Sequence, residues 1–329
     1  MLNIPPACRI AIDNMSSQAD VPQLDCHLAD EAERAAACIN AHESWGERRH
    51  VEEYVKWRMQ SVEHTRASWY VGCVDDQVVT AMGTYPIMLR AGGHSCTGYG
   101  IGGVHTLPEF RRRGYAAKLM EWVLRQQLDA GTQFGLLYSD IKPEYYAEMG
   151  YRLCESYYAW ASPRVGTEQV GDARIESFEP GESVEALAEM YAAVQSTRSI
   201  WIERDDDYWV WVLQRYPEHE WCWWVPADVD DPAGYLQVWT TETETRIFDW
   251  GVLPGANELS FWKSVFEWAA ARGIARIEGW LPSSEAISQC FEVTHRIKEL
   301  TMISPLTPEA PWDNSYKHDT AWFTECDHI

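Results

Sequence analysis

The spacing of apolar residues along this chain predicts an α/β protein. Helical spacing predicts a helix over residues 114–130, which ends at Gly131, a residue suited to a helix C-terminus. The apolar run 134–139 predicts a short buried strand, and Pro143 suits the first turn of a short helix that ends at Gly150. The apolar positions of the longer helix are Ala116, Leu119, Met120, Val123, Leu124 and Leu128.

Upstream, the same patterns predict two helices followed by a β-hairpin. Residues 28–39 are rich in good helix formers, and a second helix is predicted over 51–62. Strands over 68–74 and 78–89 flank the turn-prone triplet 75–77. We therefore expect the first domain to begin with a helix.

Residues 103–117 have the layout of an anion-binding site. A strand-like run breaks at Pro108, passes three consecutive arginines and enters the predicted helix at Gly114. A helix N-terminus offers unpaired N–H groups and partial positive charge, and the arginines add charge-assisted bonds to a diphosphate. Residues 103–117 contain neither the P-loop pattern G-x-x-x-x-G-K-[ST] nor the dinucleotide pattern G-x-G-x-x-G.

What stands instead, Arg111-x-x-Gly114-x-Ala116, resembles the Q/R-x-x-G-x-G/A signature of the GCN5-related N-acetyltransferases, the GNAT superfamily. About thirty residues later, 143–151 resembles the FYxxxGF element of the same enzymes. The resemblance implies that the loop binds the pyrophosphate of acetyl-coenzyme A. The implied loop residues are Arg111, Arg112, Arg113, Gly114, Tyr115, Ala116 and Ala117.

The same resemblance assigns a catalytic role to Tyr146, as the acid that protonates the departing thiolate. The alternative is that Tyr146 is one more aromatic in a chain with 16 tyrosines; Tyr145 is the natural control. In this family, main chain on a splayed strand binds the acetyl carbonyl and the pantetheine amides. By position these groups belong to Val104, His105 and Thr106.

The general base and the acceptor pocket stay open at the level of sequence. His105 and Asp140 are the two side-chain candidates for the base, and a water relay is the alternative. In GNAT folds the segment 41–46 borders the acceptor pocket, so Glu43 and Trp45 are candidates to receive an amine by charge pairing and cation–π contact. A solvated turn with a packed tryptophan is the other interpretation.

The second half of the chain repeats the plan of residues 99–141. It contains a predicted strand over 248–254, a helix over 259–270 and a strand over 274–281. The loop before this helix has no arginine, and Glu258 would repel a diphosphate. We therefore predict an α/β (α+β) protein of two GNAT-like domains, each a mixed, mostly antiparallel sheet with a splayed central strand pair flanked by helices. The alternative is that the strand–helix–strand order of the second half resembles residues 99–141 by coincidence.

The predicted domains are a catalytic, acetyl-CoA-binding domain over residues 1–165 and a degenerate domain over 166–329. This tandem arrangement resembles the enhanced-intracellular-survival acetyltransferases, to which the run 203–211 is also similar. It resembles the fungal lysine acetyltransferases too, through the LYSDI strand at 137–141. The former group has a third, sterol-carrier-like domain whose C-terminal carboxylate reaches the active site. The sequence leaves open whether Ile329 does so here.

The composition of the chain narrows the partners, the location and the metal content that we expect. The formal net charge of −23 disfavours nucleic acid and anionic membranes as partners and favours a cationic amine. No apolar run approaches membrane-span length, so we expect a cytoplasmic protein. The nine cysteines lack metal-ligand spacing, and we expect no metal. Among the 18 tryptophans, alternation places Trp221 and Trp223 on one face of a strand and Trp224 on the other.

Together these observations predict an acetyl-CoA-dependent N-acetyltransferase that acts on a primary amine of a small molecule by direct transfer in a ternary complex. One alternative is an acyltransferase that uses another acyl-CoA in a biosynthetic tailoring step. Another is a non-catalytic tandem-GNAT protein that binds coenzyme A or an amine. The sequence leaves the acceptor, the acyl chain length and the oligomeric state open.

Overall fold

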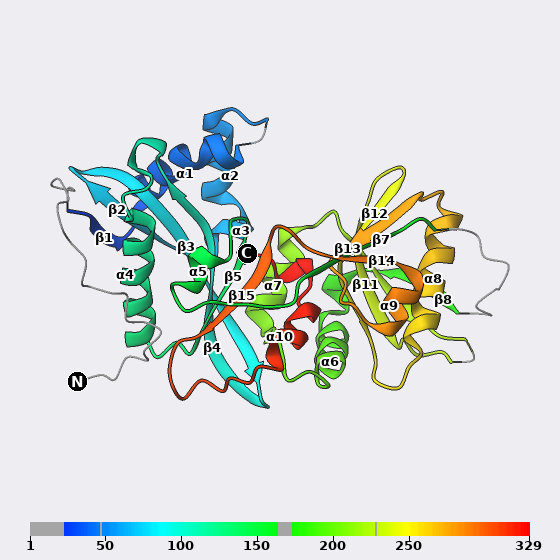
Figure 1. Cartoon of the computed structure of the whole chain (residues 1–329). Coiled ribbons are helices and arrows are strands. Elements are labelled where there is room, and N and C mark those ends of the chain that lie inside the picture. The colour runs from blue at the N-terminus through cyan, green and yellow to red at the C-terminus, as the bar shows by residue number, and fades with distance from the viewer. Residues whose placement is uncertain (1–22, 47, 164–172, 228) are drawn as a thin grey trace.

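Two sheets with their helices lie side by side in the computed structural model (Figure 1). The structure describes residues 23–46, 48–163, 173–227 and 229–329. The first sheet has the order β1-β2-β3-β4-β5-β15-β6, with β9 paired to β3. Its strands are β1 (Asp25–Leu28), β2 (Ser68–Val74), β3 (Gln77–Ala91), β4 (His94–Thr106), β5 (Phe134–Ser139), β6 (Arg152–Leu153), β9 (Ile200–Glu203) and β15 (Leu300–Pro305).

Helices cover both faces of the first sheet. Helix α1 (Glu31–Trp45) packs on the face that holds Val71, Cys73 and Ala81, whereas α4 and α5 pack on the face that holds Tyr99 and Leu137. The bounds of the other helices on this sheet are α2 (Val51–Gln60), α3 (Val62–Thr65), α4 (Tyr115–Asp129) and α5 (Glu144–Ala147). The helix predicted over 114–130 and the strand over 134–139 are confirmed.

The prediction that the first domain begins with a helix misses a strand that the described residues contain. Strand β1 precedes the first helix, which begins at Glu31 because Asp30 and Glu33 form a capping box. The helix then continues to Trp45, so Glu43 and Trp45 lie in its last turn rather than in a loop. Good helix formers over 28–39 indicated the helix, but only the cap determined where it begins.

The second sheet has the order β14-β7-β13-β12-β11-β10-β8. Its strands are β7 (Tyr157–Ala161), β8 (Arg174–Phe178), β10 (Glu220–Val225), β11 (Gly234–Thr240), β12 (Glu244–Val252), β13 (Arg276–Gly279) and β14 (Glu292–His295). The helices of this half are α6 (Val184–Gln195), α7 (Asp206–Arg215), α8 (Glu258–Ala271), α9 (Glu285–Cys290) and α10 (Tyr316–Asp319). As predicted, Trp221 and Trp224 belong to different hydrophobic clusters on opposite faces of β10.

The internal repeat is confirmed. Strand β12 runs parallel to β13 with α8 between them in sequence, as β4 runs parallel to β5 with α4 between them. The anion-binding layout of residues 103–117, called the cradle below, has no counterpart in the second half. There, Asn257 caps α8 by accepting a hydrogen bond from the N–H of Ser260. Glu258 is engaged there by the Trp262 indole and the Ser284 hydroxyl.

The two halves exchange strands. Strand β7 lies before residue 165 but pairs with β13 and β14 in the second sheet. Strand β15 lies after residue 165 but pairs with β5 and β6 in the first sheet. The division at residue 165 stays a prediction, but the sheets cross it. Within the described residues, no helix has both the length and the apolar character needed to cross a bilayer.

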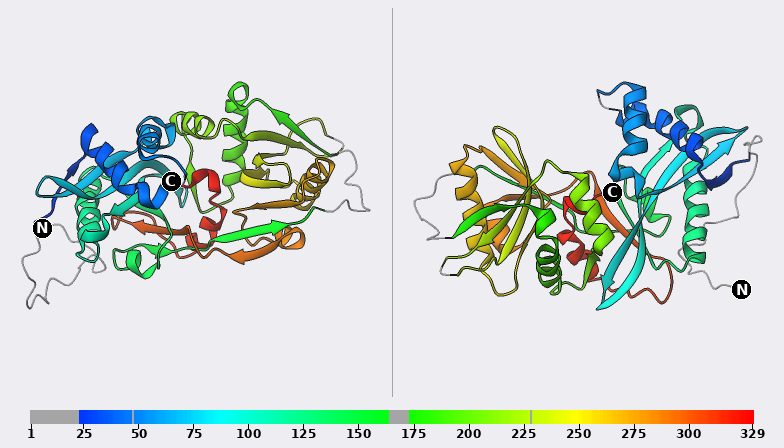
Figure 2. Two further views of the ribbon diagram at one scale, coloured as in Figure 1. Left: turned by 90° about the horizontal axis from the view of Figure 1, so that it is seen from above. Right: turned by 180° about the vertical axis from the view of Figure 1, so that it is seen from behind.

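The C-terminal segment, red in Figures 1 and 2, lies between the two sheets. A buried ion cluster holds it there. Arg204 pairs with Asp249 of β12 and donates through Nε and Nη2 to the two carboxylate oxygens of Asp327, each at 3.0 Å. The Tyr208 hydroxyl donates to Asp327 at 3.1 Å. The side chains of Arg204, Asp249 and Asp327 are at most 3% exposed, so water does not solvate their charges, and burial raises the pKa of Asp249.

We predict that Asp327→Asn lowers the free energy of unfolding by about 2 kcal/mol, because the amide keeps one acceptor oxygen and turns a donor toward Arg204 in place of a hydrogen bond between charged groups. Urea denaturation measures the loss. The control is Glu121→Gln, which breaks an exposed pair with Arg125 and should cost below about 1 kcal/mol. Equal effects of the two substitutions would contradict the role of the cluster.

Candidate functional site

Strands β4 and β5 separate in the middle of the first sheet. Their parallel pairing runs from Gly98 with Phe134 to Ile101 with Leu137 and stops there. On the other edge of β4 the register shifts, so that β4 has one residue more than β3 at this point, and Gly103 has a φ of 63°. This β-bulge turns β4 away from β5. Val104, His105 and Thr106, the predicted main-chain contacts, lie on the separated part of β4.

The arginine loop after β4 leads to an open helix N-terminus. Arg111 Nε donates to the carbonyl of Thr106 at 2.9 Å, and Arg113 Nη2 donates to the carbonyl of Glu109 at 2.9 Å. Gly114 has a φ of 76° and no side chain caps α4. A Cβ placed at Gly114 would meet no atom within 4 Å, so space lies directly in front of the first N–H groups. An anion fits this place.

Tyr146 packs on the α4 face of the sheet with Ile101 and Leu137. Its ring contacts those of Tyr145 and Tyr151. Its hydroxyl has no hydrogen-bond partner among the described residues and is not enclosed. Burial, together with Tyr145 and Asp140, raises the pKa of Tyr146 to about 12. The phenol therefore remains protonated at neutral pH, as an acid must.

A cavity of about 60 Å³ extends along the same face, between α4, α5 and the end of β15. Its walls are mainly apolar, and the Tyr99 and Tyr151 hydroxyls lie 3.2 Å apart beside it. The lining residues are Tyr99, Ala117, Met120, Glu121, Leu124, Glu148, Met149, Tyr151 and Leu306. The cavity connects the helix that carries the arginine loop with the helix that carries Tyr146.

On the opposite face the structure brings together three of the predicted residues. The rings of Trp45 and His105 are 5.9 Å apart, and Glu43 is close enough to influence the pKa of His105. Burial lowers that pKa and Arg111 adds to the effect. His105 Nε2 is enclosed without a partner. Asp140 is not part of this group. It is exposed, accepts a hydrogen bond from the N–H of Glu299 at 3.3 Å and lies near Tyr146.

Sequence reasoning missed a cluster above the bulge, formed by Arg58, His64 and Trp69. A Cβ at Gly103 would lie 3.0 Å from the Trp69 ring and 3.2 Å from Arg58 Nη2. Arg58 Nη1 contacts His64 Nε2, and the Ser61 hydroxyl lies 2.6 Å from His64 Nδ1. These residues come from α2, α3 and β2, and no local pattern in the sequence connects them.

His64 is held neutral in this cluster. Burial lowers its pKa to about 2, and Arg58, Arg215 and Arg34 add to the effect. Because a guanidinium only donates, Nε2 must accept from Arg58, which leaves the proton on Nδ1 toward Ser61. A second proton on the ring would face Arg58, so charging His64 is strongly unfavourable.

Ile329 lies against a row of alternating glycines on β4. A Cβ at Gly100 would overlap the Ile329 side chain, and one at Gly102 would lie 3.2 Å from its backbone carbon. The sequence left open whether Ile329 reaches the active site. In the structure, Ile329 lies against β4, the strand that borders the candidate site. The alternation of glycine at 98, 100 and 102 was an available signal of close approach by another segment.

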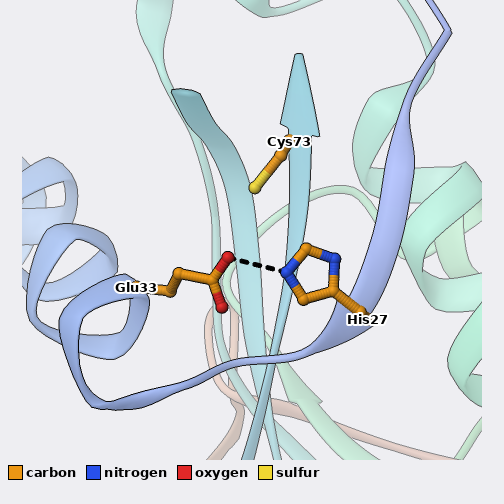
Figure 3. Close-up of side chains that lie close together, drawn as sticks. All are labelled: His27, Glu33 and Cys73. Atoms are coloured by element: carbon orange, nitrogen blue, oxygen red, sulfur yellow. Dashed lines mark hydrogen bonds and ion pairs between the residues drawn. The ribbon is translucent and has the colours of Figure 1, made fainter. Parts of the chain in front are cut away.

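One group of metal-ligand side chains lies away from this site (Figure 3). His27 Nε2 and Glu33 Oε1 are 2.7 Å apart, and the sulfur of Cys73 lies nearby. Glu33 stands in the first turn of α1, at the opposite end from Trp45. The ion pair and the capping box already account for the positions of His27 and Glu33. The group does not touch the β4 bulge.

Comparisons with known proteins agree with this geometry. Residues 26–154 match the family model described as "Acetyltransferase (GNAT) domain". A protein from Enterococcus faecalis V583 described as "Probable N-Acyltransferase" has 15% identity and a TM-score of 0.68, over 85% of this chain and 72% of that one. A GCN5-related N-acetyltransferase from Anabaena variabilis has 17% identity and a TM-score of 0.66, over 87% and 73%.

Eis1 from Mycobacterium abscessus has 16% identity and a TM-score of 0.59, over 87% of this chain and 75% of that one. At these identities the likeness shows the fold alone. A comparison with curated protein sequences gives no match. The family match thus covers residues 26–154, and the structural likeness extends over most of the chain. The chain as a whole has the two-domain α/β fold of GNAT-family N-acetyltransferases, as predicted.

We predict that the free energy of unfolding falls as the pH drops below about 6.5. Burial and nearby arginines lower the pKa values of His64, His219 and His328 to about 2, 4 and 3. The unfolded chain therefore binds more protons at these three histidines in this range, and Glu325, whose pKa is raised to about 7 by burial, offsets about one of them. Each histidine contributes stability that is complete above the unfolded pKa and is lost at about 1.4 kcal/mol per pH unit below it. Denaturation at pH 7.5 and 5.5 measures the loss.

His64→Asn should remove the contribution of one histidine to the change in unfolding free energy between pH 7.5 and 5.5, whatever its effect on stability at pH 7.5. His318→Asn is the control, because His318 is exposed beside Glu155. An unchanged pH dependence in His64→Asn would contradict a neutral His64.

Proposed function

We propose that this protein is an acetyl-CoA-dependent N-acetyltransferase that transfers the acetyl group directly to a primary amine of a small molecule in a ternary complex. The observation that carries the proposal is the separation of β4 from β5 at the Gly103 bulge. It leaves strand backbone free beside an open, arginine-flanked helix N-terminus. The GNAT match over residues 26–154 supports a transferase of this family.

The residues of the cradle suit the diphosphate of coenzyme A. The first N–H groups of α4 have no cap, Gly114 leaves the space in front of them open, and three exposed arginines stand at the entrance. These groups would bind a diphosphate through main chain and dipole together. When bound, acetyl-CoA would supply an activated acyl group as a thioester.

Residues on the two faces of the sheet would carry out the other steps of the reaction. The N–H groups of Val104, His105 and Thr106 would polarise the acetyl carbonyl. Tyr146, on the α4 face, would donate its proton to the departing sulfur. The acceptor would enter from the face of α1 and α2, where Glu43, Trp45 and His105 stand together. Water or His105 would take the proton from the amine.

We predict that Gly114→Glu abolishes binding of acetyl-CoA, because it places a carboxylate where the diphosphate would lie. Isothermal titration calorimetry measures the affinity and the number of sites per chain. Gly131→Glu is a matched control at the other end of α4, since both glycines have a φ between 76° and 79° and open space around them. Undiminished binding in Gly114→Glu would exclude the cradle.

We predict that Tyr146→Phe lowers kcat on the order of 100-fold with little change in the affinity for acetyl-CoA, because only the transferable proton is lost. Steady-state kinetics over a panel of acyl-CoA donors and amines measures the effect. Tyr145→Phe is the control, since it removes the hydroxyl of the neighbouring ring. Unchanged turnover in Tyr146→Phe would remove this residue from the mechanism, and a preference for longer acyl groups would replace acetyl as the donor.

A further inference from the structure

The guanidinium of Arg58 stands above the β4 bulge with unused hydrogen-bond donors. Nη1 contacts His64, Nε is enclosed without a partner, and Nη2 lies near Gly103, where the described side chains offer no oxygen acceptor; the Cys38 thiol is a weak sulfur partner of Arg58. In the described part of the chain no carboxylate forms an ion pair with Arg58, whereas neighbouring Arg215 pairs with Glu63 at 2.9 Å. An enclosed charged donor without an acceptor is costly unless a ligand supplies one.

Arg58 is held firmly in this position. Its guanidinium lies 5.3 Å from the Trp69 ring and 5.8 Å from the Tyr54 ring, and its backbone carbonyl accepts from Arg34 Nη2 at 3.1 Å. Arg34 also donates to the carbonyl of His64, which joins α2 to α3. A guanidinium fixed in this way loses little freedom when it binds an anion.

The surroundings of Arg58 carry an excess of positive charge, in a protein whose net charge is −23. Arg34, Arg58 and Arg215 all lower the pKa of His64, which is therefore neutral and adds no charge of its own. Glu63 is the carboxylate in this group, and it is engaged by Arg215. The excess favours an anion beside Gly103.

We propose that the acceptor amine also carries a carboxylate and that Arg58 binds it. Nη2 of Arg58 belongs to the same edge of the guanidinium through which Arg204 holds both oxygens of Asp327 in this protein, so it can donate to one oxygen of a carboxylate. A carboxylate bound to that edge of Arg58 would lie at the bulge, within reach of the separated part of β4. The acceptor class is thus amino acids and related amines with a carboxylate. This inference rests on the proposed acetyl transfer.

The experiment compares acceptors that differ only in this group. The protein is assayed with acetyl-CoA and the twenty standard L-amino acids, and each acid that is acetylated is compared with its carboxamide and its decarboxylated amine. We expect kcat/KM for the acid to exceed that of both analogues by roughly 10- to 150-fold, mainly through KM, as a hydrogen bond between charged groups provides.

Arg58→Gln should lower kcat/KM for the acid to about the value for its carboxamide in the same variant, and Arg58→Lys should restore part of the preference. Arg66→Gln is the control, because Arg66 is an arginine of the neighbouring α3–α7 groove that rests on Tyr208 and Trp211. If the acid has no advantage over its analogues, or if Arg58→Gln lowers all acceptors equally, the inference is wrong and Arg58 is structural.

A binding measurement separates this inference from the proposed function. The same acids and carboxamides are titrated into the protein with coenzyme A present, whether or not any is acetylated. Tighter binding of an acid that is lost in Arg58→Gln would support the carboxylate site even if acetyl transfer is absent. Equal binding of acid and carboxamide, or no binding of either, would overturn it.

Discussion

The structure depends on how far β4 can pair with β5. Buried backbone N–H and C=O groups need partners, and a sheet supplies them by continuous pairing. Here the extra residue at Gly103 coincides with the end of that pairing after Ile101, so part of β4 in the middle of a sheet has no β5 partner. The arginine loop follows at the end of the same strand, and Tyr146 and Arg58 approach from opposite faces. One backbone irregularity thus organises both faces of the candidate site.

The strand exchange makes the two halves depend on each other. The sheet that contains the bulge is extended by β15 next to β5, so residues 300–305 support the strand that borders the site. The Arg204 cluster then fixes the segment after β15, which ends with Ile329 against the glycines of β4. The second half, which lacks the arginine loop, therefore still shapes the site by packing.

Much of the first half could be predicted from local patterns. The helix after the arginine loop, the strand at 134–139 and the repeated plan of the second half all follow from apolar spacing, and the structure confirms them. Capping chemistry set the true start of α1 at Glu31, where propensity alone had suggested an earlier one. Among the side-chain candidates, the structure joins Glu43, Trp45 and His105 and separates Asp140 from them.

The sequence by itself determined the parts whose physics is local: the helix N-terminus at Gly114, the arginines before it and the aromatic element around Tyr146. Only the tertiary structure decided that β7 and β15 change sheets, that Ile329 lies on β4 and that Arg58, His64 and Trp69 meet above Gly103. The reason is that residue spacing records contacts along one helix or strand. Contacts between distant segments depend on which buried groups find partners once the whole chain has folded.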